Sequence, residues 1–79
     1  MTYEKIFDEL NGNQDGLRER FCRLLILLPV KETMKRALEK DIDLNITTIN
    51  NFSKFKKKID GNSAKKIFIW VERKEKEIV

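Results

Sequence analysis

The sequence LNITTINNFSKFKKKIDGNSAKKIFIW, residues 44–70, decides the fold of this chain. It predicts a short helix with a polar face, a lysine-rich turn and then a second amphipathic helix. A helix rich in acidic and basic residues precedes this stretch and ends near Asp41. Short helices joined by tight turns form compact units that are suited to binding. The stretch therefore favours a binding module over an enzyme.

The composition predicts one all-helical domain. A chain of 79 residues with 41% apolar content can build one small core but not two. Three glycines, one proline and scattered β-branched residues leave strands without their turns or their alternating pattern. We expect an all-α fold, a compact bundle of about five short helices that forms a single domain over residues 1–79.

Apolar spacing predicts helices over residues of about 2–10, 16–28, 30–41, 46–55 and 63–77. Pro29 ends the second of these helices. The residues placed to cap helix N-termini are Thr2, Asp15, Asn45 or Asp43, and Asn62 or Ser63. The charged sequence ERKEKE, residues 72–77, is expected to form a solvated last turn.

The predicted core follows the same spacing. The residues expected to point inward are Leu17, Phe21, Leu24, Leu25, Leu28, Val30, Met34, Ala37, Leu38, Ile49, Phe52, Ala64, Ile67, Phe68, Val71 and Ile78, with Trp70 at the border. Ile46 or Phe55 completes the fourth helix at one of its ends. Ile26 and Leu27 extend the apolar surface of the second helix, which is either buried between neighbours or part of a subunit contact. Burial within the monomer is the favoured alternative.

The net charge of +4 is concentrated in one stretch. Residues 44–70 carry six lysines and one aspartate, a local charge of +5, while residues 1–43 have eight basic and nine acidic side chains. Residues 71–79 have three of each kind. A polyanion would bind the central stretch because lysines near phosphates release condensed counterions. The alternative reading is a solvated lysine loop that serves solubility.

The residues that most catalytic and metal sites require are scarce. The chain has no histidine, its lone Cys22 is expected to be buried, and it has no glycine-rich phosphate loop and no zinc-ligand spacing. The carboxylates are scattered among basic residues. We therefore expect no enzyme activity, no cofactor and no metal. The apolar run at residues 24–29 is far shorter than the roughly 18 residues that cross a membrane, so we expect a cytoplasmic, nucleoid-associated protein, or a nuclear one in a eukaryote.

Residues 35–54 resemble the helix-turn-helix superfamily, in particular the small phage and plasmid regulators built like lambda repressor and Cro. That family's twenty-residue unit has apolar side chains at its fourth, eighth, tenth, fifteenth and eighteenth places, which are occupied here by Leu38, Ile42, Leu44, Ile49 and Phe52. The fifth place, usually a small residue, holds Glu39, and the usual turn glycine is Asp43. If Ala37 is instead the small contact residue, the turn is two residues longer. With its flanking residues the unit spans about 30–55, and the helix over 63–77 supports it.

The resemblance implies a sequence-specific double-stranded DNA-binding module of a small transcriptional regulator. Residues 46–55 would be the recognition helix in the major groove, where Asn50 and Asn51 suit adenine N6 and N7. Thr47 and Thr48 would contact phosphates or a thymine methyl group, and the lysines would bind phosphates. The candidate DNA-binding residues are Asn45, Thr47, Thr48, Asn50, Asn51, Lys54, Lys56, Lys57, Lys58, Lys65 and Lys66. A module of this size is expected to act as a homodimer or within a larger parent protein.

The alternative function is a helical protein–protein interaction module, or a phage-type inhibitor, that uses the same scaffold to bind another protein. A lysine loop attracts acidic protein surfaces as well as phosphates. Surplus apolar residues would suit such a contact: Ile26, Leu27, Trp70, Ile78 and Val79.

Overall fold

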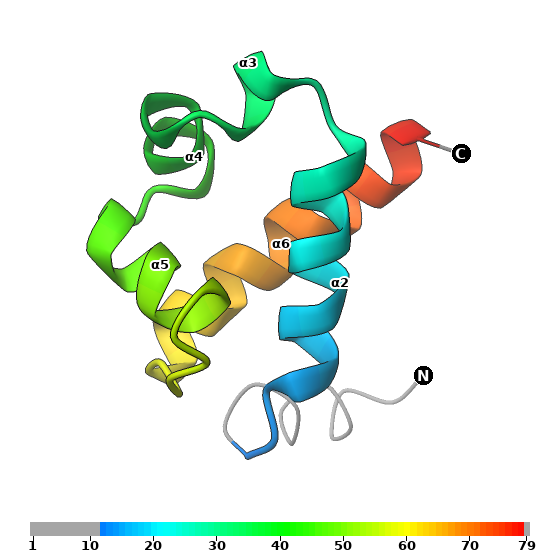
Figure 1. The fold of residues 1–79 in the computed structure, drawn as a ribbon. Helices are drawn as coiled ribbons and strands as arrows, with labels where there is room; N and C mark the ends of the chain where they lie inside the picture. Colours follow the sequence, from blue (N-terminus) through cyan, green and yellow to red (C-terminus); the bar gives the residue numbers. More distant parts are fainter. Residues whose placement is uncertain (1–11, 79) are drawn as a thin grey trace.

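A computed structural model of the chain describes residues 12–78, which form five helices and no strand (Figure 1). The helices are α2 (Asp15–Leu27), α3 (Val30–Thr33), α4 (Lys35–Ile42), α5 (Ile46–Ser53) and α6 (Gly61–Ile78). The all-α prediction is confirmed. The helix predicted over residues 2–10 lies outside the described residues, as does Val79.

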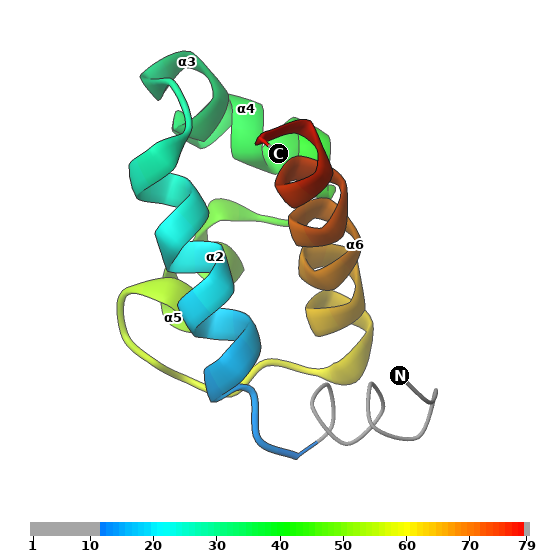
Figure 2. The same cartoon turned by 90° about the vertical axis from the view of Figure 1, so that its right-hand side faces the viewer.

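An aromatic cluster centred on Phe21 holds the helices together. Its ring lies 6.0 Å from that of Phe52 on α5 and 5.4 Å, edge-on, from that of Trp70 on α6, measured between ring centres. All three side chains are at most 1% exposed. The helices α2 and α6 pack side by side, with α4 and α5 behind them (Figure 2). Since burial of one such side chain contributes about 1.5–3 kcal/mol, the cluster is a large part of the stability of the domain.

Most of the predicted core is confirmed. The buried apolar residues are Leu17, Phe21, Leu24, Leu38, Ile42, Ile49, Phe52, Ile59, Ala64, Ile67, Trp70 and Val71, and Leu25, Leu28, Leu44, Ile46 and Phe68 pack against them. Trp70 is fully buried instead of lying at the border. Ile46 completes α5, whereas Phe55 is 65% exposed. The inward placement of Ile78 is wrong, because it lies in the last turn of α6 and is 46% exposed.

The predicted third helix is broken at Met34, so the prediction of one helix over residues 30–41 is wrong. Met34 has an extended backbone with ψ of 153°, which separates α3 from α4 (Figure 1). Val30 and Met34 are 77% and 54% exposed, so the predicted packing of their side chains does not form. Leu38 and Ile42 on α4 are buried instead. The break lets α4 turn these two residues into the core while α3 stays at the surface.

Four apolar residues near the α2–α4 junction are exposed, and we refer to Ile26, Leu27, Val30 and Met34 as the junction residues. Ile26 and Leu27 are 83% and 60% exposed, so the prediction that they are buried within the monomer is wrong. At about 100° per residue, Ile26 lies on the side of α2 opposite the face that buries Phe21. Burying it would expose the aromatic cluster.

Ion pairs join the last turns of α6 to α2 and α3. The guanidinium of Arg20 donates to the carboxylates of Glu72 and Glu75 at 2.9 and 2.5 Å. Lys74 is 7% exposed, and its Nζ lies 2.9 Å from the Glu32 carboxylate and 3.3 Å from that of Glu77. The prediction of a solvated last turn is therefore wrong for Lys74, whereas Arg73, Lys76 and Glu77 are exposed as predicted. Sequence spacing does not reveal partners this far apart in the chain.

These pairs shift the pKa values of Arg20, Lys74 and Glu75. The hydrogen bond from Arg20 lowers the pKa of Glu75 and raises the pKa of Arg20 above its usual range. The hydrogen bond to Glu32 raises the pKa of Lys74. Because the folded state prefers charged Glu75, this carboxylate stabilises the fold above its ordinary pKa near 4.5. That contribution disappears as the pH falls through the lowered pKa of the folded protein.

Substitution of Glu75 should change how the free energy of unfolding depends on pH under acidic conditions. We expect Glu75→Gln to lower the free energy of unfolding at pH 7, and the difference from wild type to shrink as the pH falls below about 4.5. Urea unfolding between pH 2 and pH 7 measures it. Glu19→Gln is the control, since the Glu19–Arg23 pair is exposed and 3.6 Å long. A difference between wild type and Glu75→Gln that stays constant with pH would contradict this account.

Candidate functional site

The polar face of α5 points away from the core. Ile49 and Phe52 are buried on one side of this helix, and at about 100° per residue Thr47, Asn51 and Lys54 fall on the opposite side. Among the candidate residues on and beside α5, Asn45, Thr47 and Lys54 are exposed, whereas Thr48, Asn50 and Asn51 are half-buried. All six are accessible to solvent. The helix ends at Ser53, two residues before the predicted end.

A three-residue turn, residues 43–45, positions α5 against α4. Asp43 has a left-handed backbone with φ of 64° and ψ of 48°, and its N–H donates to the Glu39 carbonyl at 3.0 Å. The Asn45 side chain accepts a hydrogen bond from the Thr47 N–H at 2.8 Å, so Asn45 and not Asp43 caps the helix. The Glu39 carboxylate accepts from the Ile46 N–H at 2.9 Å. Two otherwise unpaired N–H groups at the start of α5 are thus bound by side chains.

The segment that follows α5, residues 54–60, is the lysine loop, and Gln14 holds one end of it. The Gln14 side-chain N–H₂ donates to the Ile59 carbonyl at 2.8 Å, and its side-chain oxygen accepts from the Ile59 N–H at 3.0 Å. Gln14 is 3% exposed and Ile59 is 9% exposed. One side chain therefore satisfies both backbone groups of a buried loop residue, which would otherwise be costly to bury.

Arg18 holds the other end of the lysine loop. Its Nε donates to the Phe52 carbonyl at 2.6 Å, one terminal nitrogen to the Lys57 carbonyl at 3.2 Å, and the other to the Asp15 carboxylate at 2.6 Å. The guanidinium also lies 4.9 Å from the centre of the Phe52 ring. The last carbonyls of a helix lack partners within the helix and attract a positive charge. Arg18 supplies that charge to the end of α5.

Sequence reasoning missed both Gln14 and Arg18. The signal was present, because positions 14, 18 and 21 are spaced as one helix face and the last of them is the central Phe21. Polar residues at apolar spacing can carry buried hydrogen bonds. The prediction that Asp15 caps this helix is wrong: Gln14 precedes α2, and Asp15 is its first residue. The Asp15 N–H donates to the side chain of Asn13.

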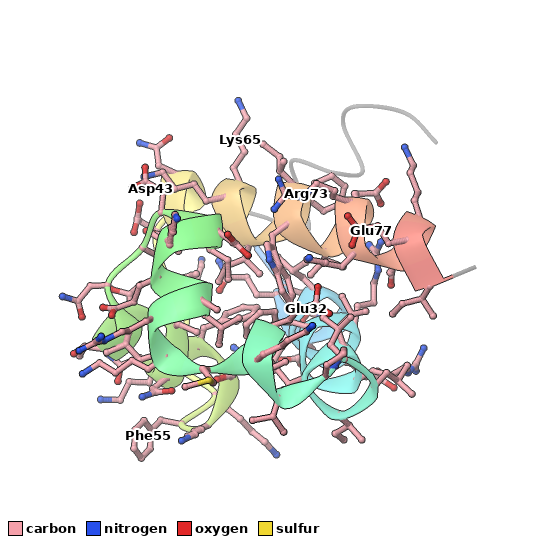
Figure 3. The ribbon with its side chains drawn as sticks, turned by 90° about the horizontal axis from the view of Figure 1, so that it is seen from above. Glu32, Asp43, Phe55, Lys65, Arg73 and Glu77 are labelled. Atoms are coloured by element: carbon pink, nitrogen blue, oxygen red, sulfur yellow. The ribbon has the colours of Figure 1, made fainter. Side chains whose placement is uncertain are left out.

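The lysines of the candidate site are exposed. Among the ion pairs of residues 12–78, none involves Lys54, Lys56, Lys57, Lys58 or Lys65. Lys66 differs from them, because its Nζ lies 3.1 Å from the Asp43 carbonyl and 3.3 Å from the Asp43 carboxylate. Lys66 therefore ties α6 to the turn before α5. Figure 3 shows Asp43 and Lys65 toward one side of the molecule and Phe55 on the other.

Asp60 sets the start of α6, in place of the predicted caps Asn62 or Ser63. Its carboxylate accepts from the Ser63 N–H at 3.2 Å and from the Ser63 hydroxyl at 2.6 Å. These hydrogen bonds lower the pKa of Asp60. The charge that they stabilise is the single acidic one among the residues 44–70.

The described residues are expected to lack metal-ligand spacing and a membrane-spanning segment, and two features of the structure bear on these expectations. In residues 12–78 no three His, Cys, Asp or Glu side chains are grouped so that they could hold a metal ion. No helix in this described part is both long and apolar enough to cross a membrane. Cys22 is half-buried, against the prediction of full burial, because it lies at the edge of the α2 core face. Its thiol donates to the Ser53 carbonyl at 3.8 Å.

Asp43 gives a test of the turn. An L-residue in the left-handed region costs about 1–2 kcal/mol, and a β-branched residue costs more. We expect Asp43→Val to lower the free energy of unfolding by about 2 kcal/mol, and Asp43→Gly to change it by less than about 1 kcal/mol. Urea unfolding followed by circular dichroism measures both. Asp41→Val, at an exposed helical position, is the control. An equal loss of unfolding free energy in Asp41→Val and Asp43→Val would show that the left-handed backbone at position 43 is not what makes valine costly there.

Arg18 gives a test of how the lysine loop is held. A lysine cannot reproduce three divergent donors, so Arg18→Lys should lower the free energy of unfolding by about 2 kcal/mol. Amide hydrogen exchange should also speed up at Lys57, whose N–H donates to the Asn51 carbonyl at 2.8 Å. Arg23→Lys on the exposed side of α2 is the matched control, with an expected change within about 0.5 kcal/mol. Unchanged exchange at Lys57 in the Arg18 variant would show that the loop is held by other contacts.

Comparison with protein-family models, with curated proteins and with solved structures finds no significant match to this chain. The observations that bear on its function are therefore those of the chain itself. They are a compact all-helical arrangement of the described residues, an accessible polar face on α5, and a lysine loop held against α2.

Proposed function

We propose that this chain is a sequence-specific double-stranded DNA-binding module of a small transcriptional regulator. In this proposal α5 enters the major groove and the lysine loop binds the phosphates beside it. The observation that carries the proposal is the position of the exposed lysines Lys54, Lys56, Lys57 and Lys58 directly after a helix with an outward polar face. That arrangement matches a groove lined by base edges and bordered by phosphates.

The arrangement of α4 and α5 supports the resemblance to helix-turn-helix regulators. Leu38, Ile42, Ile49 and Phe52 are each at most 4% exposed, and Leu44 packs against them, as the pattern requires. Three residues join the two helices, which fits the register over residues 35–54 and not the longer turn. The left-handed Asp43 stands where that pattern has glycine. Glu39, which departs from the pattern, binds the N–H of Ile46 across the turn.

The side chains of α5 suit the edges of bases. A side-chain amide such as that of Asn51 can donate to and accept from adenine, and Thr47 lies in the first turn, which points toward base edges in helices that read the major groove. The oxygen of Asn45 is used in capping, which leaves its N–H₂ group for a phosphate or a base. Lys66 is the weakest of the proposed phosphate ligands, since it is already paired with Asp43.

The salt dependence of binding tests the proposal. Fluorescence anisotropy with random duplexes, and with duplexes selected from a randomised library, should give affinities that fall steeply as salt rises. Lys57→Ala should weaken binding to all duplexes alike and reduce the salt slope by about 1. Asn51→Ala should lower affinity for the selected duplex by about 1–3 kcal/mol and bring it toward that for random duplexes.

Lys76→Ala is the matched control for Lys57→Ala. Lys76 is an exposed lysine near the end of α6, and this helix starts directly after the lysine loop and runs away from it (Figure 1). We expect Lys76→Ala to leave both affinity and salt slope unchanged. Equal effects of the two lysine variants would show that only net charge matters. Absence of duplex binding at low salt would refute the proposal.

Protein binding is a second candidate function, favoured by the exposure of the junction residues. Ile26, Leu27, Val30 and Met34 are each more than half exposed, and exposed apolar groups are typical of contact surfaces. Ile78, half of whose surface is accessible, remains available for such a contact, but buried Trp70 does not. If the domain binds a protein partner through the junction residues and does not bind DNA, Leu27→Lys should abolish binding of that partner. Lys57→Ala should leave the same binding intact. Analytical ultracentrifugation of Leu27→Lys also tests whether these residues join two copies of the chain.

A further inference from the structure

Phe55 is an exposed aromatic residue in the lysine loop. The residue is 65% exposed, and its ring points away from the helices (Figure 3). The other aromatic side chains of residues 12–78 are buried or packed against the core: Phe21, Phe52, Phe68 and Trp70. The other large apolar residues that are exposed lie on α2, α3 and α6, apart from Met34, which separates α3 from α4. Phe55 is therefore the one large apolar group that the described residues expose within the lysine loop, residues 54–60.

The backbone around Phe55 is held in place on both sides. Its N–H donates to the Asn50 carbonyl at 3.2 Å, and the N–H of Lys57 donates to the Asn51 carbonyl at 2.8 Å. Arg18 binds the Lys57 carbonyl from α2. Between these anchors Lys56 takes a left-handed conformation with φ of 52°, which turns the chain back toward α2. The ring is thus presented on an ordered turn, and ordering it costs little when a partner binds.

The surroundings of Phe55 identify the kind of partner that fits. Lys54 precedes the ring, and Lys56, Lys57 and Lys58 follow it, all exposed. An apolar group bordered by cations complements an apolar group bordered by anions. In duplex DNA that combination occurs in the major groove, where thymine methyl groups lie between two lines of phosphates. Phe55 lies two residues after the end of α5, and its N–H donates to the Asn50 carbonyl, so the ring is held directly beside the last turn of that helix.

We infer that Phe55 makes an apolar contact with a thymine methyl group in the major groove, while the adjacent lysines bind the phosphates. The inference rests on the proposed function and names one of the bases that the domain reads. The contact contributes base preference without charge. It therefore changes affinity but not the dependence of affinity on salt, which separates it from the contribution of the lysines.

A double-mutant cycle tests this contact. The probe is the tightest duplex selected from a randomised library, together with derivatives in which each thymine in turn is replaced by deoxyuridine, which removes only the methyl group. For the wild-type chain, one such replacement should lower affinity about fourfold, the factor that corresponds to one buried methyl-sized group. The same replacement should leave the affinity of Phe55→Ala unchanged.

Phe55→Ala should also bind the unmodified duplex about tenfold more weakly, with a salt slope equal to that of wild type. Phe55→Leu is the matched control that keeps an apolar side chain, and it should retain part of the response to deoxyuridine. Circular dichroism should show both variants folded, since the ring lies outside the core. If every deoxyuridine replacement weakens wild type and Phe55→Ala by the same factor, the contact does not exist.

The two proposals fail in different ways. If the wild-type chain binds no duplex at low salt, the DNA-binding proposal and the Phe55 contact fall together. If the chain binds duplexes with a steep salt slope and Lys57→Ala reduces it, but no thymine couples to Phe55, only the contact is refuted. A salt slope that falls in Phe55→Ala as much as in Lys57→Ala would also refute it, because the substitution would then act by displacing the lysines.

Discussion

The hydrogen bonds of Arg18 are the constraint on which the candidate site depends. One guanidinium on α2 joins the end of α5 to the loop that follows it, through the carbonyls of Phe52 and Lys57. It is 8% exposed and stacks over the Phe52 ring. Because the same side chain touches the aromatic cluster and the lysine loop, the position of the exposed lysines is set by the packing of the core. The geometry of the candidate site therefore depends on the packing of the core.

Charge is divided between two parts of the molecule. The arginines of α2 and the buried Lys74 each have a carboxylate partner on α2, α3 or α6. Internal pairing of this kind balances these positive charges within the domain. The lysine loop, by contrast, contains four lysines and one acidic residue, Asp60, which is occupied in capping α6. The resulting uneven field would orient the domain toward a polyanion before contact, because charged surfaces steer encounters over about a Debye length.

The apolar spacing of the sequence predicts most of the core, because Phe21, Ile49 and Ile67 are placed by helix geometry that acts over only a few residues. The outward face of α5 follows from the same rule. The features that sequence reasoning missed depend on partners far along the chain: Arg18 bonds to a carbonyl 34 residues away, and Lys74 to a carboxylate 42 residues away. The break at Met34 also depends on distant residues. The chain turns there so that α4 can pack against the core, and the spacing of apolar residues does not show where that core lies. The roles of the candidate residues depend on a partner, which the chain by itself does not contain.

The burial of Trp70 has an optical consequence. It is the single tryptophan of the chain, it is 1% exposed, and its indole makes a T-shaped contact with the Phe21 ring. Its near-ultraviolet emission should be blue-shifted while the core is intact and move to longer wavelength as water enters. Since the indole is far from solvent, a ligand on the outer face of α5 should leave this emission unchanged. The chain thus contains its own fluorescent reporter of folding, which is insensitive to whatever the lysines bind.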